Sequence, residues 1–312
     1  MAVDDRAGES WTLPEGLPKR WLLVTQYYLP EPGAAQIRLS TLVKILREQG
    51  LEVEVFTAMP NYPTGEIAEK YRGKLRAGLT HTNAMYAAML ESLDQVVGRI
   101  CQKLEELQLS NRTILIFTSD NGGHLPTTSN VPLRVGKASC YEGGTRVPLI
   151  VSWPRVTRAG SDCDVPVISP DLYPTVLEMA ALKDAAGHQP DGVSFVPLLR
   201  ESGAIDRDAL YWHYPHYQLY QQGGTTPYGA IRSGDWKLIE FFDDQRIELY
   251  NLKEDIGERH NLATEIPAKA AQLLARLHQW RRDVGAQMPS PNPAYDPSQP
   301  EHVPAAKAKK KA

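Results

Sequence analysis

Short apolar runs separated by polar turns dominate the pattern of this chain. Residues 113–118 (T-I-L-I-F-T) form such a run, which is rich in β-branched side chains and too short for a buried helix. This run therefore predicts a buried strand in a parallel sheet. Similar runs predict further strands over residues 21–25, 52–57, 147–153, 165–168, 229–240 and 246–252.

Other stretches repeat their apolar residues at the spacing of a helix. Residues 37–46 do so between two of the predicted strands, which indicates a βαβ unit of the Rossmann type. Residues 85–107 predict a long amphipathic helix, and residues 171–181 predict a shorter one. A fourth helix, over 268–284, is expected to pack on the short antiparallel strands of 229–252. These elements together indicate an α/β fold with a smaller antiparallel subdomain near the carboxyl end.

Polar residues follow the strand at 113–118 at the place where ligands bind in open α/β sheets. Asp120 and Asn121 offer oxygen ligands to a hard divalent cation, and two glycines after them allow a tight turn. Downstream, Lys137 suits an oxyanion, because its charge offsets that of the anion. The alternative is an ordinary surface turn with a solvated lysine, since such turn residues are common.

Two histidines stand among aromatic residues in Y-W-H-Y-P-H-Y (211–217). His213 and His216 could bind an anion when charged or donate a proton to a leaving group. The aromatic residues could form walls for a sugar or aryl ring. The alternative is a buried aromatic patch whose histidines are already hydrogen-bonded.

Composition limits the classes of partner and compartment. The chain has 312 residues and a net charge of −3, so it gives no global reason to expect nucleic acid or an anionic membrane as a partner. It has no apolar run long enough to span a membrane, and its first ten residues lack the apolar core of a signal peptide, so we expect a cytoplasmic protein. Three cysteines are too few for a disulfide framework, and we expect Cys101 to be packed and Cys140 semi-buried.

Several motifs together resemble the C-terminal half of a type I, formylglycine-type sulfatase or arylsulfatase. The resemblance covers residues 86–297, in family order and with family-like spacing. It rests on T-S-D-N-G-G (118–123), G-K-A-S-C-Y-E-G-G-T-R-V-P (136–148), S-P-D-L-Y-P-T-V-L (169–177), D-G-V-S-F-V-P-L-L (191–199) and A-I-R-S-G-D-W-K-L-I (230–239).

This resemblance implies an alkaline-phosphatase-like partial sheet with a smaller C-terminal sheet subdomain, and hydrolysis of sulfate esters of a small molecule or glycan. It also implies calcium and a formylglycine nucleophile as cofactors. Carried over by motif, Asp120 and Asn121 would be calcium ligands, and Lys137 would hold a sulfate oxygen. Weaker candidates for catalysis or substrate contact are His124, His213 and His216.

The family pattern is incomplete in this chain. The C/S-x-P-x-R motif that yields formylglycine does not occur in it, and two side chains are too few for a calcium ion. We therefore expect a sulfuric ester hydrolase that is inactive by itself. The alternative is a non-catalytic remnant that binds sulfated glycans.

The first part of the chain carries a second resemblance, to the amino end of a family-4-type glycosyltransferase with two Rossmann domains. It rests on residues 26–39, 59–67 and 71–74, and a glycosyltransferase fragment is a third, more distant interpretation. These two resemblances together predict a truncated and chimeric chain, in which fragments of two families are joined. The predicted segments are a disordered leader (1–20), a glycosyltransferase-like βαβ fragment (21–75), a sulfatase-like core (76–205), a C-terminal subdomain (206–290) and a disordered basic tail (291–312).

Overall fold

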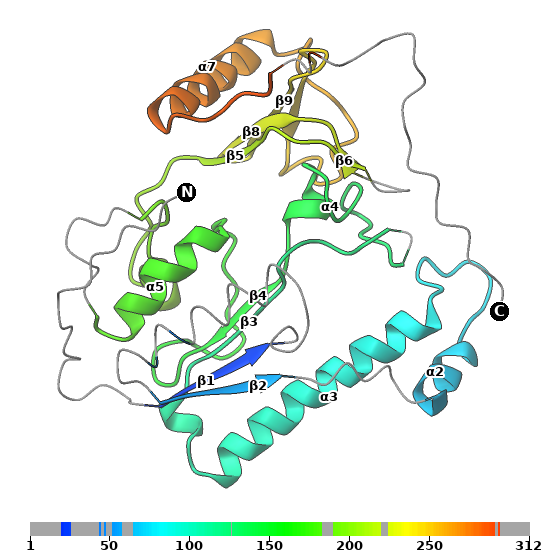
Figure 1. Cartoon of the computed structure of the whole chain (residues 1–312), viewed down its shortest axis with the longest axis vertical. Helices are drawn as coiled ribbons and strands as arrows, with labels where there is room; N and C mark the ends of the chain where they lie inside the picture. Colours follow the sequence, from blue (N-terminus) through cyan, green and yellow to red (C-terminus); the bar gives the residue numbers. More distant parts are fainter. Residues whose placement is uncertain are drawn as a thin grey trace. The chain divides into compact units, whose positions relative to one another are not determined.

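A computed structural model describes residues 20–25, 44, 47, 52–57, 65–125, 127–182, 190–219, 224–290 and 293. The chain divides into two compact units (Figure 1). Unit 1 comprises residues 1–129 and 147–207, and unit 2 comprises residues 130–146 and 208–312. The predicted disorder of the leader and of the basic tail concerns residues that, apart from Arg20 and Pro293, lie outside the described ones.

The first strands of unit 1 are those predicted from the sequence. Strand β1 (Arg20–Thr25) pairs in parallel with β2 (Glu52–Thr57), with Trp21 opposite Val53. Of the helix predicted over 37–46, only Lys44 lies within the described residues, and it is helical.

Two helices follow in unit 1. Helix α2 (Gly65–Arg72) is joined to α3 (Ala84–Glu106) by an ion pair of 2.7 Å between Lys70 Nζ and Glu91 Oε2. The side chain of Asn83 caps α3, because it accepts a hydrogen bond of 3.0 Å from the amide of Tyr86. The long helix predicted over 85–107 is therefore confirmed. The expectation for Cys101 is wrong: its side chain is exposed, because it lies on the solvent-facing side of α3.

A two-stranded ribbon departs from the prediction for residues 113–118. Strand β3 (Leu115–Thr118) follows a short 3₁₀ turn, η1 (Ser110–Arg112), and pairs antiparallel with β4 (Leu149–Ser152). Its Phe117 is 37% exposed, and Ile150 on β4 is 61% exposed. A buried strand in a parallel sheet was therefore the wrong expectation. The pairing is antiparallel because β4 runs alongside β3 in the opposite direction. No other described strand pairs with β3 or β4, so part of this ribbon is exposed to solvent.

The rest of unit 1 is built around a buried carboxylate. The 3₁₀ turn η2 (Ser169–Asp171) leads into α5 (Leu172–Met179), and α6 (Val196–Leu199) follows. The strand predicted over 165–168 does not form, because the Ile168 amide donates to Asp171 Oδ2 at 2.8 Å and so begins the turn instead of joining a sheet. Asp171 is fully buried and also binds the guanidinium of Arg207, with 2.6 Å between Nη1 and Oδ1.

Unit 2 contains the antiparallel sheet expected near the carboxyl end. Its four strands lie in the order β10–β9–β8–β5, and a two-stranded ribbon of β6 and β7 accompanies them. The strands are β5 (Leu210–Tyr214), β6 (Gln218–Leu219), β7 (Gly224–Thr225), β8 (Tyr228–Ser233), β9 (Trp236–Phe241) and β10 (Ile247–Asn251).

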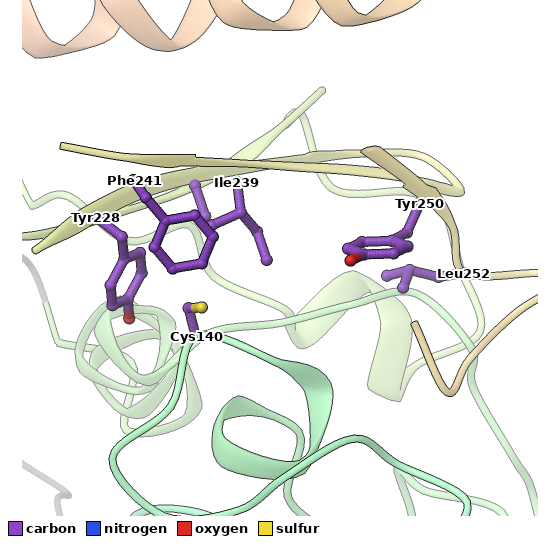
Figure 2. Close-up of a cluster of buried hydrophobic side chains, with 7 residues drawn as sticks. Cys140, Tyr228, Ile239, Phe241, Tyr250 and Leu252 are labelled. Atoms are coloured by element: carbon purple, nitrogen blue, oxygen red, sulfur yellow. The ribbon is translucent and has the colours of Figure 1, made fainter. Parts of the chain in front are cut away.

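Each face of this sheet is covered, because side chains alternate between the two faces of a strand. Leu238 and Leu249 point to one face and pack against Leu273 and Leu277 of helix α7 (Pro267–Asp283), as predicted for that helix. The opposite face carries Ala230, Ile239, Phe241 and Tyr250. Figure 2 shows Cys140, from the segment 130–146, reaching up to these side chains. Unit 2 is therefore three layers deep: helix α7, the sheet, and the segment 130–146.

Candidate functional site

The predicted metal ligands lie in the turn directly after β3. Thr118 Oγ1 donates to the carbonyl of Pro148 at 2.9 Å, and Ser119 Oγ donates to the carbonyl of Asn121 at 3.0 Å, so both ends of the turn are fixed. Asp120 is exposed, and its carboxylate has no hydrogen bond or ion pair with any residue that the structure describes. Asn121 is half-buried. The carboxylate is therefore available to a cation.

The described residues do not complete a calcium site around this turn. Nowhere in the described ranges do three or more His, Cys, Asp or Glu side chains gather in a way that could hold a metal ion. Calcium takes about six to eight oxygen ligands, and Asp120 and Asn121 supply only part of that number. His124, in the same loop, is exposed, and its Nδ1 lies 3.2 Å from Thr127 Oγ1.

Lys137 lies in unit 2, in the loop that precedes the short helix α4 (Glu142–Thr145). The lysine is half-buried, and within the described part of the chain it has no hydrogen-bond or ion-pair partner. Its neighbours Val135 and Ala138 have backbone φ angles of 57° and 68°, which lie in the left-handed region. A partly desolvated ammonium group without a counter-ion can take up an anion.

Cys140 follows in the same loop and is only 2% exposed. Burial raises the pKa of its thiol to about 12, so the thiol stays protonated at neutral pH and cannot act as a nucleophile. The expected packing of this residue is confirmed, and the structure places it deeper than a semi-buried position (Figure 2).

The two predicted histidines of unit 2 have different surroundings. His213 lies on β5, and its Nε2 is 2.7 Å from the carbonyl of Gln287. It lies on the α7 face of the sheet, whereas the segment that carries Lys137 packs on the opposite face. His216 is exposed beyond the end of β5 and stands edge-on to Tyr214, with 5.5 Å between the ring centroids.

The predicted site residues are thus divided between the two units. The turn with Asp120, Asn121 and His124 belongs to unit 1, and Lys137, His213 and His216 belong to unit 2. Within unit 2 the sheet separates His213 from the segment of Lys137.

A buried charge cluster beneath the loop of Lys137 was not predicted. It consists of Glu142 on α4, Lys237 on β9 and Glu258, and each of these residues is at most 3% exposed. Lys237 lies in the otherwise apolar strand sequence W-K-L-I. A lysine at such a position is expected to be buried and to need a charged partner, and this is the signal by which it could have been found. Its partners lie far away along the chain and cannot be identified without the fold.

Comparisons with known proteins find similarity to sulfatases over most of the described chain. A family model described as Sulfatase matches residues 54–182. A second model, described as N-sulphoglucosamine sulphohydrolase, C-terminal, matches residues 135–284. The resemblance of residues 21–75 to a glycosyltransferase finds no support, and the Sulfatase match begins inside that segment.

Individual proteins agree with these matches. A "Sulfatase" from Formosa agariphila is 36% identical over 238 residues, which cover 70% of this chain and 43% of that protein. The crystal structure of Ps i-CgsB in complex with k-i-k-neocarrahexaose is 26% identical with a TM-score of 0.63, covering 81% of this chain and 55% of that one. A third protein, solved with its substrate D-glucosamine-2-N,6-O-disulfate, is 28% identical with a TM-score of 0.57, covering 72% of this chain and 47% of its own.

The chain therefore spans about half the length of the relatives that it matches. In the described residues, no helix is both long enough and apolar enough to cross a membrane.

Proposed function

Because this chain carries a sulfatase C-terminal region over residues 54–284, we propose that it binds the sulfate group of a sulfate ester through Lys137. Its fold is the alkaline-phosphatase-like α/β fold of sulfatases. The observation that carries the proposal is that Lys137 stands in the motif G-K-A-S-C-Y-E-G-G-T-R-V-P, half-buried and without an ion-pair partner among the described residues.

The chemistry of Lys137 suits this role. A sulfate monoester carries one negative charge, spread over its terminal oxygens. A partly desolvated ammonium group stabilises that charge more strongly than an ammonium group in bulk water does. During cleavage of a sulfate ester, the same ammonium would stabilise the charge that develops on the transferred group.

We further propose Asp120 and Asn121 as part of a calcium site, because a free carboxylate and a carboxamide adjoin in one fixed turn. Calcium would supply Lewis-acid chemistry when bound. The described residues fall short of its usual ligand number, and no catalytic step is assigned to it. Among the histidines, the exposed His124 and His216 are accessible to a substrate, whereas His213 already bonds to a carbonyl.

We propose binding without turnover for this chain by itself. No C/S-x-P-x-R motif occurs in its 312 residues, so the formylglycine nucleophile of the family cannot form in them. The loss of a nucleophile commonly lowers the rate of an enzyme by several orders of magnitude. The absence of the motif favours a second candidate function, in which the chain binds sulfated glycans without cleaving them.

The substrate class we propose is a sulfated sugar. Of the proteins compared above, one was solved with D-glucosamine-2-N,6-O-disulfate as its substrate, and another with a neocarrahexaose. Tyr217, which is 62% exposed close to His216, offers an aromatic face on which a sugar ring could stack. The glycosyltransferase resemblance adds no function to this proposal, because it covers only the first part of the chain.

Hydrolysis of a chromogenic aryl sulfate by the purified chain tests the catalytic part of the proposal. We expect no turnover above buffer, either with calcium or with a chelator. Chelator-sensitive turnover that disappears in Asp120→Ala would show that another residue supplies the nucleophile. In that case the chain would be an enzyme and not a binding module.

A further inference from the structure

The loop that carries Lys137 holds a backbone conformation that it would not adopt by itself. Val135 and Ala138, on either side of the lysine, have φ angles of 57° and 68°. A β-branched residue is a rare outlier in this left-handed region, because its side chain crowds the backbone. Such conformations persist only where the surrounding structure fixes them, and they gather at functional sites. The surroundings of this loop must therefore hold it in place.

The first constraint is the close approach of α4 to the loop backbone. A Cβ atom added to Gly143 would lie 2.3 Å from the carbonyl oxygen of Arg134, and one added to Gly144 would lie 2.3 Å from that of Ser139. Only glycine allows this contact. The amide of Gly143 donates to the Arg134 carbonyl at 2.9 Å, so the loop closes onto the helix.

The second constraint is the buried charge cluster at the start of α4. Lys237 Nζ lies 2.9 Å from Glu142 Oε1 and 2.9 Å from Glu258 Oε1. Glu258 Oε2 also accepts a hydrogen bond of 2.6 Å from the backbone amide of Glu142. The lysine thus places one positive charge between two buried carboxylates. One of these carboxylates belongs to α4, and the other binds the first amide of α4.

A third contact joins the beginning of the loop to the same cluster. The guanidinium of Arg134 donates to the carbonyl of Glu258 at 2.9 Å and to Tyr250 Oη at 2.8 Å. It also lies 3.8 Å from the centroid of the Tyr141 ring. Both ends of the Lys137 loop are therefore anchored on Glu258 and its neighbours.

We propose that Lys237 is a positioning residue, which together with Glu142 and Glu258 holds the Lys137 loop in its anion-binding conformation. This inference rests on the proposed function for the role of Lys137. In this role Lys237 supports the loop and does not contact the substrate itself. Without its charge, Glu142 and Glu258 repel each other, α4 loses its anchor, and the loop relaxes toward ordinary backbone angles.

The test compares Lys237→Met with the matched variant Lys253→Met in the full chain. Lys253 is an exposed lysine of unit 2 whose side chain has no hydrogen-bond or ion-pair partner among the described residues. Two quantities are measured: hydrogen–deuterium exchange of the backbone amides, and the Kd for inorganic sulfate. In Lys237→Met we expect the amides of Ser139 and Gly143 to exchange at least about ten-fold faster and the Kd to rise about ten-fold or more. The amides of β8 and β9 should keep their protection, and Lys253→Met should change neither quantity.

Unchanged exchange at Ser139 and Gly143 in Lys237→Met would overturn the proposal, as would a loss of protection spread evenly over the sheet. If that variant does not fold, the triple variant Lys237→Met, Glu142→Gln, Glu258→Gln replaces it, because it removes the two carboxylates that the loss of Lys237 would leave buried and charged. It should show the same faster exchange in the loop, and wild-type exchange there would refute the proposal.

Lys137→Ala separates this inference from the proposed function. If sulfate binding is the same in Lys137→Ala as in wild type, the proposed function fails. The exchange rates of the loop still decide the role of Lys237 in that case, because they do not depend on sulfate.

Discussion

The substitution Arg207→Met should destabilise unit 1 far more than the loss of an ordinary surface ion pair. Asp171 is fully buried, and its carboxylate accepts three hydrogen bonds: from Arg207 Nη1 at 2.6 Å, from the Ile168 amide at 2.8 Å and from the Val193 amide at 2.9 Å. Methionine keeps an unbranched apolar chain of similar reach but removes the one positive charge that, among the described residues, lies within hydrogen-bond distance of the carboxylate. The carboxylate would then be buried with two backbone donors.

The expected loss follows from that geometry. Removal of one partner of a buried ion pair costs about 3–5 kcal/mol, because the remaining charge is left uncompensated. The two backbone donors remain, and hydrogen bonds to a charged group contribute about 1.5–3 kcal/mol each. We therefore expect about 3 kcal/mol, at the lower end of the range.

Arg158→Met provides the control, because it makes the same change in the same unit. Arg158 Nε lies 3.1 Å from Glu201 Oε1, but the two side chains are 71% and 51% exposed, so solvent screens the pair and its loss should cost at most about 1 kcal/mol. The assay is urea unfolding, with hydrogen exchange at the Val193 amide as the local readout. A loss in Arg207→Met no larger than in Arg158→Met would refute the account of Asp171.

Three further predictions concern unit 2. Leu277→Ala should lower the free energy of unfolding by about 2–5 kcal/mol in urea, because Leu277 is fully buried between α7 and the sheet; a loss below about 1 kcal/mol would contradict that packing. Burial raises the pKa of Glu258 above its ordinary 4.5, so its contribution to stability is present below pH 4.5 and is lost as the pH rises through the raised value. The free energy of unfolding, measured as the pH rises above 4.5, should therefore fall less steeply in Glu258→Gln than in wild type. An unchanged slope would contradict a raised pKa for this buried carboxylate. In the native chain, a thiol reagent should label the exposed Cys101 and Cys163 and leave Cys140 unmodified until urea is added; rapid labelling of Cys140 would refute its burial.

The sequence predicted those elements whose pattern is local. Helix α3 has apolar residues at helical spacing, and that signal lies within its own residues. Strands β8, β9 and β10 of unit 2 formed where strands were predicted over 229–240 and 246–252, whereas β5, β6 and β7 were not predicted. Such elements follow from the period of their side chains and do not depend on distant partners.

The errors concern properties that depend on distant partners. The residues of β3 have a β-branched pattern, but its direction relative to β4 is set by a return of the chain 30 residues later. Residues 165–168 are apolar, yet the Asp171 carboxylate binds their last amide and turns the chain into a helix. A strand pattern shows where a strand can form, but not which neighbour it pairs with or whether anything covers it.

The residues of the candidate site also divide into those with a local signal in the sequence and those that depend on distant partners. Asp120, Asn121 and Lys137 could be named from the sequence, because each stands in a recognisable motif beside glycines. The partners that hold Lys137 in place could not be named, because Glu142, Lys237 and Glu258 are spread over more than a hundred residues, and Glu142 and Lys237 alone are 95 positions apart. Only the fold of unit 2 brings them together.

The most direct test of the account compares the equilibrium binding of an aryl sulfate with that of the same phenol without its sulfate. We predict that the wild-type chain binds the sulfate ester at least about ten-fold more tightly, and that Lys137→Ala removes this preference, since a hydrogen bond to a charged group contributes about 1.5–3 kcal/mol. Equal affinity for the two ligands in the wild type, or a preference that survives in Lys137→Ala, would contradict the claim that this chain recognises a sulfate group through Lys137.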